Sequence, residues 1–336
     1  MYAYSELYLA ENNIDDYNKN LPMLNWKKVY EYNISAFESL CVLGSCNGIL
    51  CLSLFIPGAP PLVSNIFMYN PITREKLPIP DVRFPECEDD PQFRSGFGFD
   101  VSEKKYKLVL VLLYKLNRIP IQNEVLIHTV GSKMWRRKVG IVPDELYGAH
   151  GQTSFLSVDG SLHWIAVKYA YERNNYELFI VSFSLGVEEF TYVPTPNSLV
   201  VNHSWHHSYH YVLGVLEEQL SFVDSSSCNF IKIWVRKSDN GKKCWIKQIF
   251  IQKHLVCRWG HEFVTPIKLR KSGEILFLVS DDRTKSKSMV SYNTESGKCR
   301  SVSVESKESK FRYIRVIPHE GSLMSLRSAC GLDRDT

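Results

Sequence analysis

The chain has 336 residues, 44% of them hydrophobic and 23% charged, which is typical of a globular protein and excludes a disordered or collagen-like chain. Its 40 basic and 36 acidic residues give a net charge of +4, too even a balance to predict a nucleic-acid partner. No run of roughly 18 apolar residues is present and the first residues do not resemble a signal peptide, so we expect no membrane association and a place in the cytoplasm or nucleus.

Short β-rich runs follow one another along the chain, and no long window shows helical periodicity. The clearest apolar runs are residues 49–52, 108–112, 178–181, 231–235 and 275–279. Runs of this length with many branched residues are typical of buried strands. The sequence therefore predicts an all-β fold.

Two kinds of tight turn alternate between these strands. The first kind returns about every 56 residues, at Asn47-Gly48, Glu103-Lys104-Lys105, Asp159-Gly160, Glu217-Glu218 and Ser272-Gly273. The second kind follows each of these after roughly 20 to 25 residues, between strands that end and begin at Tyr69 and Leu77, His128 and Trp135, Ser184 and Phe190, Val235 and Trp245, and Tyr292 and Arg300. Each unit thus has four strands, which we name a, b, c and d, and this is the composition of a β-propeller blade.

The number of units predicts six blades. Five complete units run from residue 41 to residue 303, and residues 312–326 supply one more hairpin, with Glu320-Gly321 in its turn. The N-terminal runs 7–9 and 29–32 are suitable strands to complete that last blade and close the ring. We therefore assign residues 1–40 to a segment that closes the propeller, 41–326 to the propeller and 327–336 to a disordered tail.

The long connections all fall on one side of such a propeller. In a meander the a–b and c–d turns lie on one face, the turn face, and the b–c and d–a connections lie on the other, the loop face. The long connections are all of the b–c or d–a kind, at residues 55–64, 81–93, 115–123, 141–152, 168–176, 197–208, 251–262 and 281–287. Long loops on a rigid scaffold often bind ligands, so the loop face is the predicted recognition surface.

Three of these connections carry residue types that dominate the hot spots of protein interfaces. The candidate partner-binding residues are Tyr169, Tyr171, Arg173, Trp205, His206, Arg258 and Trp259. Ordinary packing within the loops is the alternative role of these side chains.

Several groups of polar residues are candidate chemical sites. A histidine cluster could bind a metal with help from Asp144 and Glu145, although we favour a solvated loop; it consists of His203, His206, His207 and His210. An acidic run in another long connection could serve a glycosidase, although it too is typical of a solvated loop; it consists of Glu86, Glu88, Asp89 and Asp90. The nine cysteines form no CxxC pair and no hydrolase or phosphate-binding motif is present, so we expect no metal, no cofactor and no catalytic residue.

Several of these runs together resemble the F-box-associated domain of plant F-box proteins, a kelch-related family. The runs are 44–52 (GSCNGILCL), 69–75 (YNPITRE), 96–100 (GFGFD), 106–109 (YKLV), 158–164 (VDGSLHW), 182–185 (SFSL), 233–235 (IWV), 244–245 (CW) and 273–276 (GEIL). They cover roughly residues 41 to 326 in the family's order, so the set is more specific than any single run.

The resemblance implies a protein-binding receptor that presents its target, a protein of unknown identity, to an SCF-type ubiquitin ligase, and not an enzyme. In the family a separate N-terminal F-box binds the Skp-type linker of the ligase. No segment before Cys41 fits the F-box pattern, so contact with the linker and cullin is expected only if an F-box lies upstream. The alternatives are a stand-alone binding propeller that competes with its full-length relatives, and a propeller glycosidase or lyase.

Overall fold

The computed structural model describes most of the chain. The described residues are 3–11, 25–34, 39–55, 64–82, 92–113, 115–116, 119–120, 123–139, 142–143, 156–170, 175–196, 200–201, 210–239, 241–257, 262–269, 273–281, 287–302 and 319–332.

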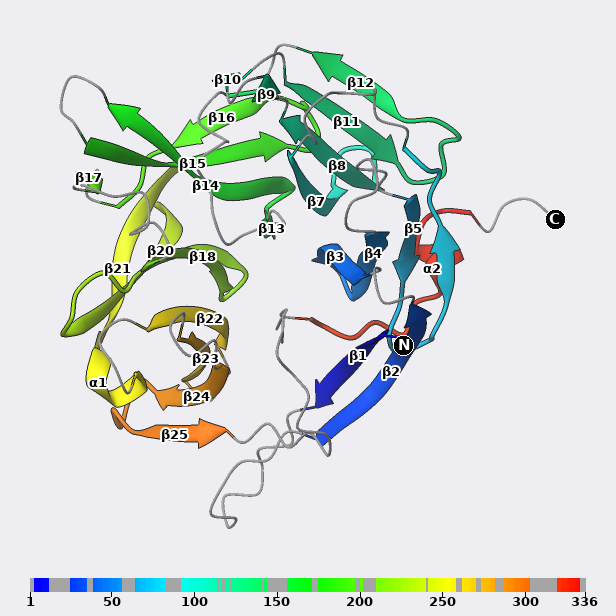
Figure 1. Ribbon diagram of the computed structural model, residues 1–336. Coiled ribbons are helices and arrows are strands. Elements are labelled where there is room, and N and C mark those ends of the chain that lie inside the picture. Colours follow the sequence, from blue (N-terminus) through cyan, green and yellow to red (C-terminus); the bar gives the residue numbers. More distant parts are fainter. Residues whose placement is uncertain are drawn as a thin grey trace.

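Five antiparallel sheets stand in a ring, four of them with four strands and one with a fifth strand added to its four, which confirms the predicted all-β propeller (Figure 1). The strands of blade 1 are β3 (Ser39–Cys46), β4 (Ile49–Phe55), β5 (Ser64–Tyr69) and β6 (Lys76–Pro78). Those of blade 2 are β7 (Gln92–Asp100), β8 (Lys105–Leu113), β11 (Glu124–Thr129) and β12 (Arg136–Val139). Those of blade 3 are β13 (Leu156–Val158), β14 (Ser161–Ala170), β15 (Asn175–Ser184) and β16 (Phe190–Val193). Those of blade 4 are β18 (Tyr211–Leu216), β19 (Gln219–Asp224), β20 (Phe230–Asp239) and β21 (Lys242–Gln252). Those of blade 5 are β22 (Phe263–Leu269), β23 (Glu274–Ser280), β24 (Lys287–Asn293) and β25 (Cys299–Val302).

The remaining described elements are short or lie outside the blades. They are β1 (Ala3–Glu11), β2 (Asn25–Ile34), β9 (Lys115–Leu116), β10 (Ile119–Pro120), β17 (Val200–Val201), α1 (Lys253–Val256) and α2 (Leu326–Ala329). Strand β17 pairs with β15, and β9 pairs with β10. Within the described residues no helix has the length and apolar character needed to cross a membrane.

The prediction of six blades was wrong, because only five sheets of four or more strands form within the described residues. The N-terminal runs that we expected to complete a sixth blade are strands, but they pair with each other, with Leu7 opposite Tyr30. The resulting two-stranded sheet β1–β2 lies between blade 5 and blade 1 in the ring (Figure 1). Of the predicted C-terminal hairpin, residues 312–318 lie outside the described residues, and residues 319–325 form neither strand nor helix.

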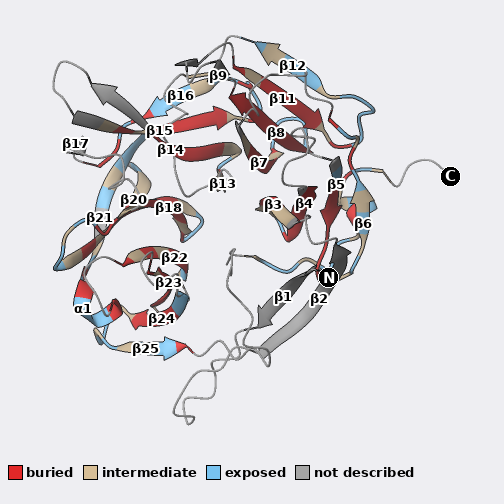
Figure 2. Ribbon diagram, in the orientation of Figure 1, coloured by how far each residue is buried: buried red, intermediate tan, exposed pale blue. Residues whose placement is uncertain are grey.

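Apolar side chains fill the seams between neighbouring blades. Strand β8 shows the pattern, because Leu108 and Leu110 pack in the cluster shared with blade 1, whereas Val109 and Val111 pack in the cluster shared with blade 3. A strand that is buried on both faces needs a continuous apolar run rather than an alternating one. Figure 2 shows this burial on the inner strands and exposure along outer strands such as β12 and β16.

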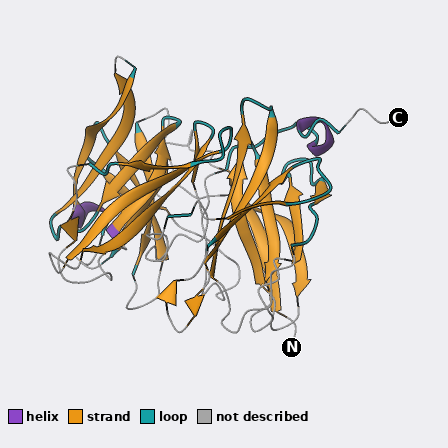
Figure 3. Ribbon diagram, turned by 90° about the horizontal axis from the view of Figure 1, so that it is seen from above, coloured by secondary structure: helices purple, strands orange, loops and turns teal. Residues whose placement is uncertain are grey.

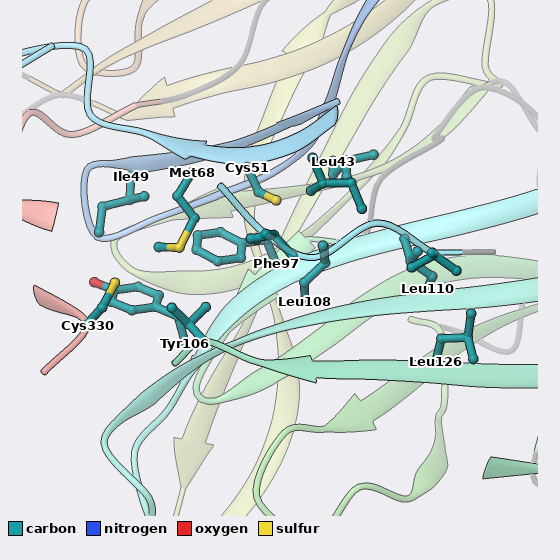
Figure 4. Close-up of a cluster of buried hydrophobic side chains, with 14 of the residues drawn as sticks. Leu43, Ile49, Cys51, Met68, Phe97, Tyr106, Leu108, Leu110, Leu126 and Cys330 are labelled. Atoms are coloured by element: carbon teal, nitrogen blue, oxygen red, sulfur yellow. The ribbon is translucent and has the colours of Figure 1, made fainter. Parts of the chain in front are cut away.

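The first seam requires a glycine at a close approach of two inner strands. A Cβ atom on Gly44 of β3 would lie 2.6 Å from the Cβ of Phe97 and 2.8 Å from its backbone nitrogen in β7. Any larger residue would push the strands apart and uncover the Phe97 ring, which is fully buried and stacked at 5.4 Å on Tyr106 (Figure 4). Burial of such a ring contributes about 1.5–3 kcal/mol.

Two tryptophans tie the outer strands of neighbouring blades together. The indole nitrogen of Trp135 in blade 2 donates to the Pro80 carbonyl of blade 1 at 2.8 Å. Trp245 of blade 4 repeats this contact with the Pro194 carbonyl of blade 3 at 2.6 Å. A proline carbonyl just after the outer strand is free of ladder partners, so it is available to an indole N–H of the next blade.

Candidate functional site

The two faces of the propeller differ as expected from the strand order. The a–b and c–d turns are short and lie on the turn face, along the upper edge in Figure 3, where α2 is also found. The connections β4–β5, β8–β11, β14–β15 and β23–β24 are of the b–c kind, and they leave the blades on the opposite side.

Most of the predicted partner-binding residues lie outside the described residues. Tyr169 alone has a described backbone, which pairs with Tyr176 near the loop-face end of the β14–β15 hairpin. Tyr171, Arg173, Trp205, His206, Arg258 and Trp259 are not among the described residues. Their role on the loop face therefore stays a prediction.

The histidine and acidic clusters fall mainly outside the described residues as well. Of their members only His210 is described; its ring lies 5.0 Å from that of Phe263, and its carbonyl accepts hydrogen bonds from Ser225. Within the described part of the chain, no group of three or more His, Cys, Asp or Glu side chains could hold a metal ion.

The c–d turn of blade 1 binds a segment from the far end of the chain. The fully buried Asn70 donates both amide hydrogens, to the carbonyls of Ser322 at 2.9 Å and Met324 at 3.0 Å. Its Oδ1 accepts from the backbone amides of Ile72 at 2.9 Å and Thr73 at 3.3 Å, so the same side chain also shapes the turn. All four hydrogen-bonding positions of this amide are satisfied.

A carboxylate fixes the start of α2 beside this turn. Oε2 of Glu75 accepts the backbone amide hydrogen of Leu326 at 2.5 Å. This hydrogen bond lowers the pKa of Glu75, because it favours the charged form. The backbone amides in the first turn of a helix have no acceptor within the helix. Glu75, from another part of the fold, provides an acceptor for one of them.

Packing completes the attachment of residues 319–332, which we name the C-terminal latch. Gly48 in the a–b turn of blade 1 has φ +76°, and a Cβ there would lie 2.6 Å from the Glu320 carbonyl oxygen. Leu326 is 1% exposed and packs with Cys330 in the cluster of blades 1 and 2, where Cys330 lies beside Tyr106 (Figure 4). The first part of the segment that we expected to be a disordered tail from residue 327 is therefore helical and packed.

The latch presents apolar side chains to solvent at the same place. Leu323 is 85% exposed and Met324 57% exposed, although the backbone carbonyl of Met324 is held by Asn70. Ile72 lies next to them, because its side chain is 3.2 Å from a Cβ position on Gly321. Contiguous exposed apolar patches mark protein contact sites, and these three side chains gather at one place. Val101, Met134 and Val187 add exposed apolar side chains on turns of blades 2 and 3.

An ion cluster joins the turn-face ends of blades 2 and 3. The buried Lys107 ammonium lies 2.7 Å from Asp100 and 3.1 Å from Glu188. Glu188 also binds the Arg136 guanidinium through both carboxylate oxygens, at 2.9 and 2.5 Å, and Lys138 at 3.2 Å. Hydrogen bonds from Arg136 outweigh burial and lower the pKa of Glu188 to about 2. Burial acts to raise the pKa of Asp100, but hydrogen bonds from Lys107 and Ser102 lower it to about 2.

Sequence reasoning found the turn at residues 70–73 but missed its second role. The Asn-Pro pair predicts a turn from its local backbone preferences. The bonds from Asn70 to residues about 250 positions away leave no periodic signal in the sequence. The only hint in the sequence is that the side-chain amide of Asn70 can donate two hydrogen bonds.

Comparison with known proteins places the chain in a family. Residues 12–323 match the sequence model of the F-box associated beta propeller domain. The F-box protein At3g07870 of Arabidopsis thaliana is 28% identical over 296 residues, covering 79% of this chain and 66% of that protein. The F-box/kelch-repeat protein At3g23880 of Arabidopsis thaliana is 23% identical over 155 residues, covering 46% of this chain and 38% of that protein. The chain thus spans less than two thirds of the length of these relatives.

Solved structures add no further argument. The Trypanosoma rangeli sialidase in complex with the inhibitor DANA has 8% sequence identity and a TM-score of 0.45, covering 90% of this chain and 54% of that protein.

The family match spans all five blades, β2 and the beginning of the latch. On that match, the chain belongs to the F-box associated β-propeller domain family.

Proposed function

We propose that this chain is the substrate-recognition part of an SCF-type ubiquitin ligase, and that it binds a target protein without performing chemistry on it. The observation that carries the proposal is the family match over residues 12–323, together with relatives whose names are those of F-box proteins. Binding would hold lysines of the target near a ubiquitin-charged enzyme and so raise their effective concentration. We place this activity in the cytoplasm or nucleus.

The use of the family-like motifs within the fold supports a binding role. Asn70 holds the latch, Gly44 allows the close packing of Phe97, and Trp245 ties blade 4 to blade 3. These residues build the scaffold, which leaves recognition to surface residues around it. Such a division suits a receptor in which related proteins share a scaffold and differ in their targets.

Two surfaces are available for the target. From the sequence, Tyr171, Arg173, Trp205 and Trp259 are predicted to lie on the loop face. The turn face carries Leu323 and Met324, held in place by the latch. We propose the loop face as the main contact, because its residue types are those enriched in hot spots.

A capture experiment tests the proposal. This chain and a form extended upstream, where the transcript encodes one, serve as baits, and each is probed for the Skp-type linker, for cullin and for other bound proteins. The proposal predicts a reproducible specific partner with both baits and the linker only with a bait that contains an F-box. A specific partner without linker on any bait would instead establish a stand-alone binding propeller.

Variants of the bait then assign the face. Loop-face variants (Tyr171→Ala with Arg173→Ala, or Arg258→Ala with Trp259→Ala) should weaken capture of that partner at least about tenfold, the usual effect of losing a hot spot. The turn-face variant Leu323→Ser with Met324→Ser is the matched control and should retain capture. The reverse result would move the binding site to the turn face.

A further inference from the structure

The seam between blades 3 and 4 ends in a polar layer at the turn face. Ile165, Trp234 and Trp245 share one apolar cluster in this seam. Side chains two positions apart on a strand lie on the same face of the sheet. His163, Arg236 and Lys243 are each two positions nearer the turn face than Ile165, Trp234 and Trp245, respectively, so they lie in the same seam. Asp159 of the a–b turn joins the layer through its 2.8 Å ion pair with Lys243.

The neighbouring seam shows what this position does when its charges are balanced. Lys107 is the third residue of strand b in blade 2 and points toward blade 3. There it meets Asp100, Glu103 and Glu188, while Arg136 and Lys138 bind Glu188. Three cations thus face three carboxylates.

The seam between blades 3 and 4 lacks that balance. His163 is the third residue of strand b in blade 3, the place that Lys107 holds in blade 2. The side chains across from it are two cations, Arg236 and Lys243, and among the described side chains of this layer only Asp159 supplies a negative charge. Lys242 has the opposite parity along its strand, so it belongs to the other face of blade 4.

Two polar groups in this layer, the guanidinium of Arg236 and Nδ1 of His163, have no hydrogen-bond partner among the described residues. Arg236 is partly buried, and this burial lowers the pKa of its guanidinium. The guanidinium forms no hydrogen bond or ion pair with the described residues. His163 is 5% exposed; its ring forms a hydrogen bond with the backbone of Val158, but its Nδ1 is buried without a partner. A partly desolvated cation without an acceptor is unfavourable, and a bound anion would relieve it.

We propose that Arg236 and Lys243 bind a phosphorylated side chain of the partner protein at the turn-face end of this seam, as a second contact of that partner besides its main contact on the loop face. This inference rests on the proposed function, since it specifies the chemistry of the bound partner. A guanidinium can donate two parallel hydrogen bonds to a phosphoryl group, and the flexible lysine adds a point charge. The Lys243–Asp159 pair is exposed on both sides and contributes little stability, so Lys243 is free to exchange its partner.

His163 reports on occupancy of this site. Burial and then the positive charge of Arg236 lower the pKa of His163 to about 4, with Lys243 adding to the effect. A phosphoryl dianion between these cations would cancel their repulsion of a proton on the ring. Binding therefore raises the pKa of His163, whereas a role of the cations in packing alone would leave it unchanged.

The first test titrates the whole chain with O-phosphoserine and follows the His163 ring signal by NMR, assigned by comparison with His163→Gln. We expect a saturable shift and a higher pKa of His163 in the bound state. Arg236→Gln should weaken binding about tenfold, as expected for the loss of a charge-assisted contact. Lys242→Gln removes the neighbouring exposed lysine of the opposite face and should leave binding unchanged. Aspartate and serine serve as the carboxylate and neutral probes.

Several results would overturn the inference. The first is the absence of a saturable shift of the His163 signal up to about 20 mM phosphoserine, a concentration at which a site with a Kd of roughly 1 mM is nearly full. The second is an equal shift on addition of aspartate. The third is that Lys242→Gln weakens phosphoserine binding as much as Arg236→Gln does. Arg236→Gln should keep the unfolding midpoint of the parent chain, so its effect can be separated from misfolding.

The second test uses the partner identified by capture, before and after phosphatase treatment. Capture that falls on dephosphorylation and in Arg236→Gln supports the site. Capture that is insensitive to both overturns it while the proposed function stands. The phosphoserine titration requires no partner, so failure of the capture experiment affects the proposed function and leaves the titration decisive for the site.

Discussion

Glu188 shows how one side chain can join two blades. It lies in the c–d turn of blade 3 with φ +60°, a left-handed conformation that costs a residue with a side chain about 1 kcal/mol. That conformation directs its carboxylate to Lys107, Arg136 and Lys138 of blade 2. Removal of Glu188 would leave the buried Lys107 with less negative charge around it. The ion pairs of Glu188 therefore stabilise the seam and offset the cost of its left-handed conformation.

This arrangement makes stability depend on pH. Glu188 has an ordinary pKa of 4.5 and a pKa of about 2 in the fold, so its contribution is fully present above pH 4.5 and is lost as the pH falls toward 2. The contribution is on the order of 2–3 kcal/mol. Urea unfolding between pH 7 and pH 2 should show this loss in the parent chain, and Glu188→Gln should show a smaller decrease from a lower stability at pH 7.

Glu189 provides the matched control for this measurement. It is the exposed neighbour of Glu188, and its side chain forms no hydrogen bond or ion pair with the described residues. Glu189→Gln should reproduce the pH profile of the parent chain. A profile of Glu188→Gln as steep as that of the parent would show that other carboxylates, such as Asp100, carry the acid sensitivity.

At the level of single residues the sequence predicts local roles better than distant ones. The Asn47-Gly48 and Asp159-Gly160 turns follow from their residue types, and all four residues have positive φ. The bonds from Asn70 to Ser322 and Met324 join parts of the chain with no common pattern. The cation layer of Arg236 and Lys243 was missed for the same reason, since only the packing of two blades brings it together.

The C-terminal latch is an element that holds its place by side-chain contacts rather than by strand pairing. Leu326→Ala should destabilise it by about 2–5 kcal/mol, because a fully buried leucine is replaced. The Cys330 thiol reports the opening of the latch, since burial raises its pKa to about 11 and keeps it unreactive at neutral pH. We expect rapid alkylation of Cys330 in Leu326→Ala, measured by peptide mass spectrometry, and slow alkylation in the parent chain.

Leu323 is the control within the same segment. Its side chain is 85% exposed, so Leu323→Ala should change stability by less than about 0.5 kcal/mol. The exposed Cys228 and Cys244 should react quickly in every variant and calibrate the labelling. Equal protection of Cys330 in Leu326→Ala and in Leu323→Ala would mean that the latch does not depend on the buried leucine.

Elements were predicted well where a strand and its turn use the same local signal. Strands c and d of blade 1 meet at Tyr69 and Lys76, within one residue of the predicted positions Tyr69 and Leu77. In blade 4 the hairpin is longer, because β20 continues to Asp239 and β21 begins at Lys242. The strand ends were predicted from apolar runs, and the residues at the hairpin tip are polar, so the sequence does not predict this extension. The backbone pairing nevertheless continues through Lys237 and Cys244.

The number of blades is a property of the whole molecule that the sequence could not give. The count of six assumed that each late turn signal adds strands to a blade. The carbonyls of Ser322 and Met324 instead bind a side chain of blade 1, so this segment is satisfied without joining a sheet. Local turn residues do not distinguish these two ways of satisfying a backbone.

The gap between blades 5 and 1 leads to a prediction for the whole ring. The described side chains of one apolar cluster there all come from blade 1 and include the buried Leu52 and Phe67. The described side chains of another all come from blade 5 and include Leu276 and Met289. The β1–β2 sheet lies at this place in the ring, so we infer that it protects these faces (Figure 1).

A chain that lacks residues 1–38 should therefore expose two apolar blade faces and associate. We expect oligomers by size-exclusion chromatography with light scattering, and an unfolding curve that is broader than that of the parent chain, because exposed apolar faces promote association and the closed ring loses a joint. A peptide of residues 1–38 added in trans should restore the monomer, which separates loss of closure from general misfolding. If the shortened chain stays monomeric with an unchanged unfolding midpoint, blades 1 and 5 do not depend on β1–β2, and the five blades form a stable open ring without it.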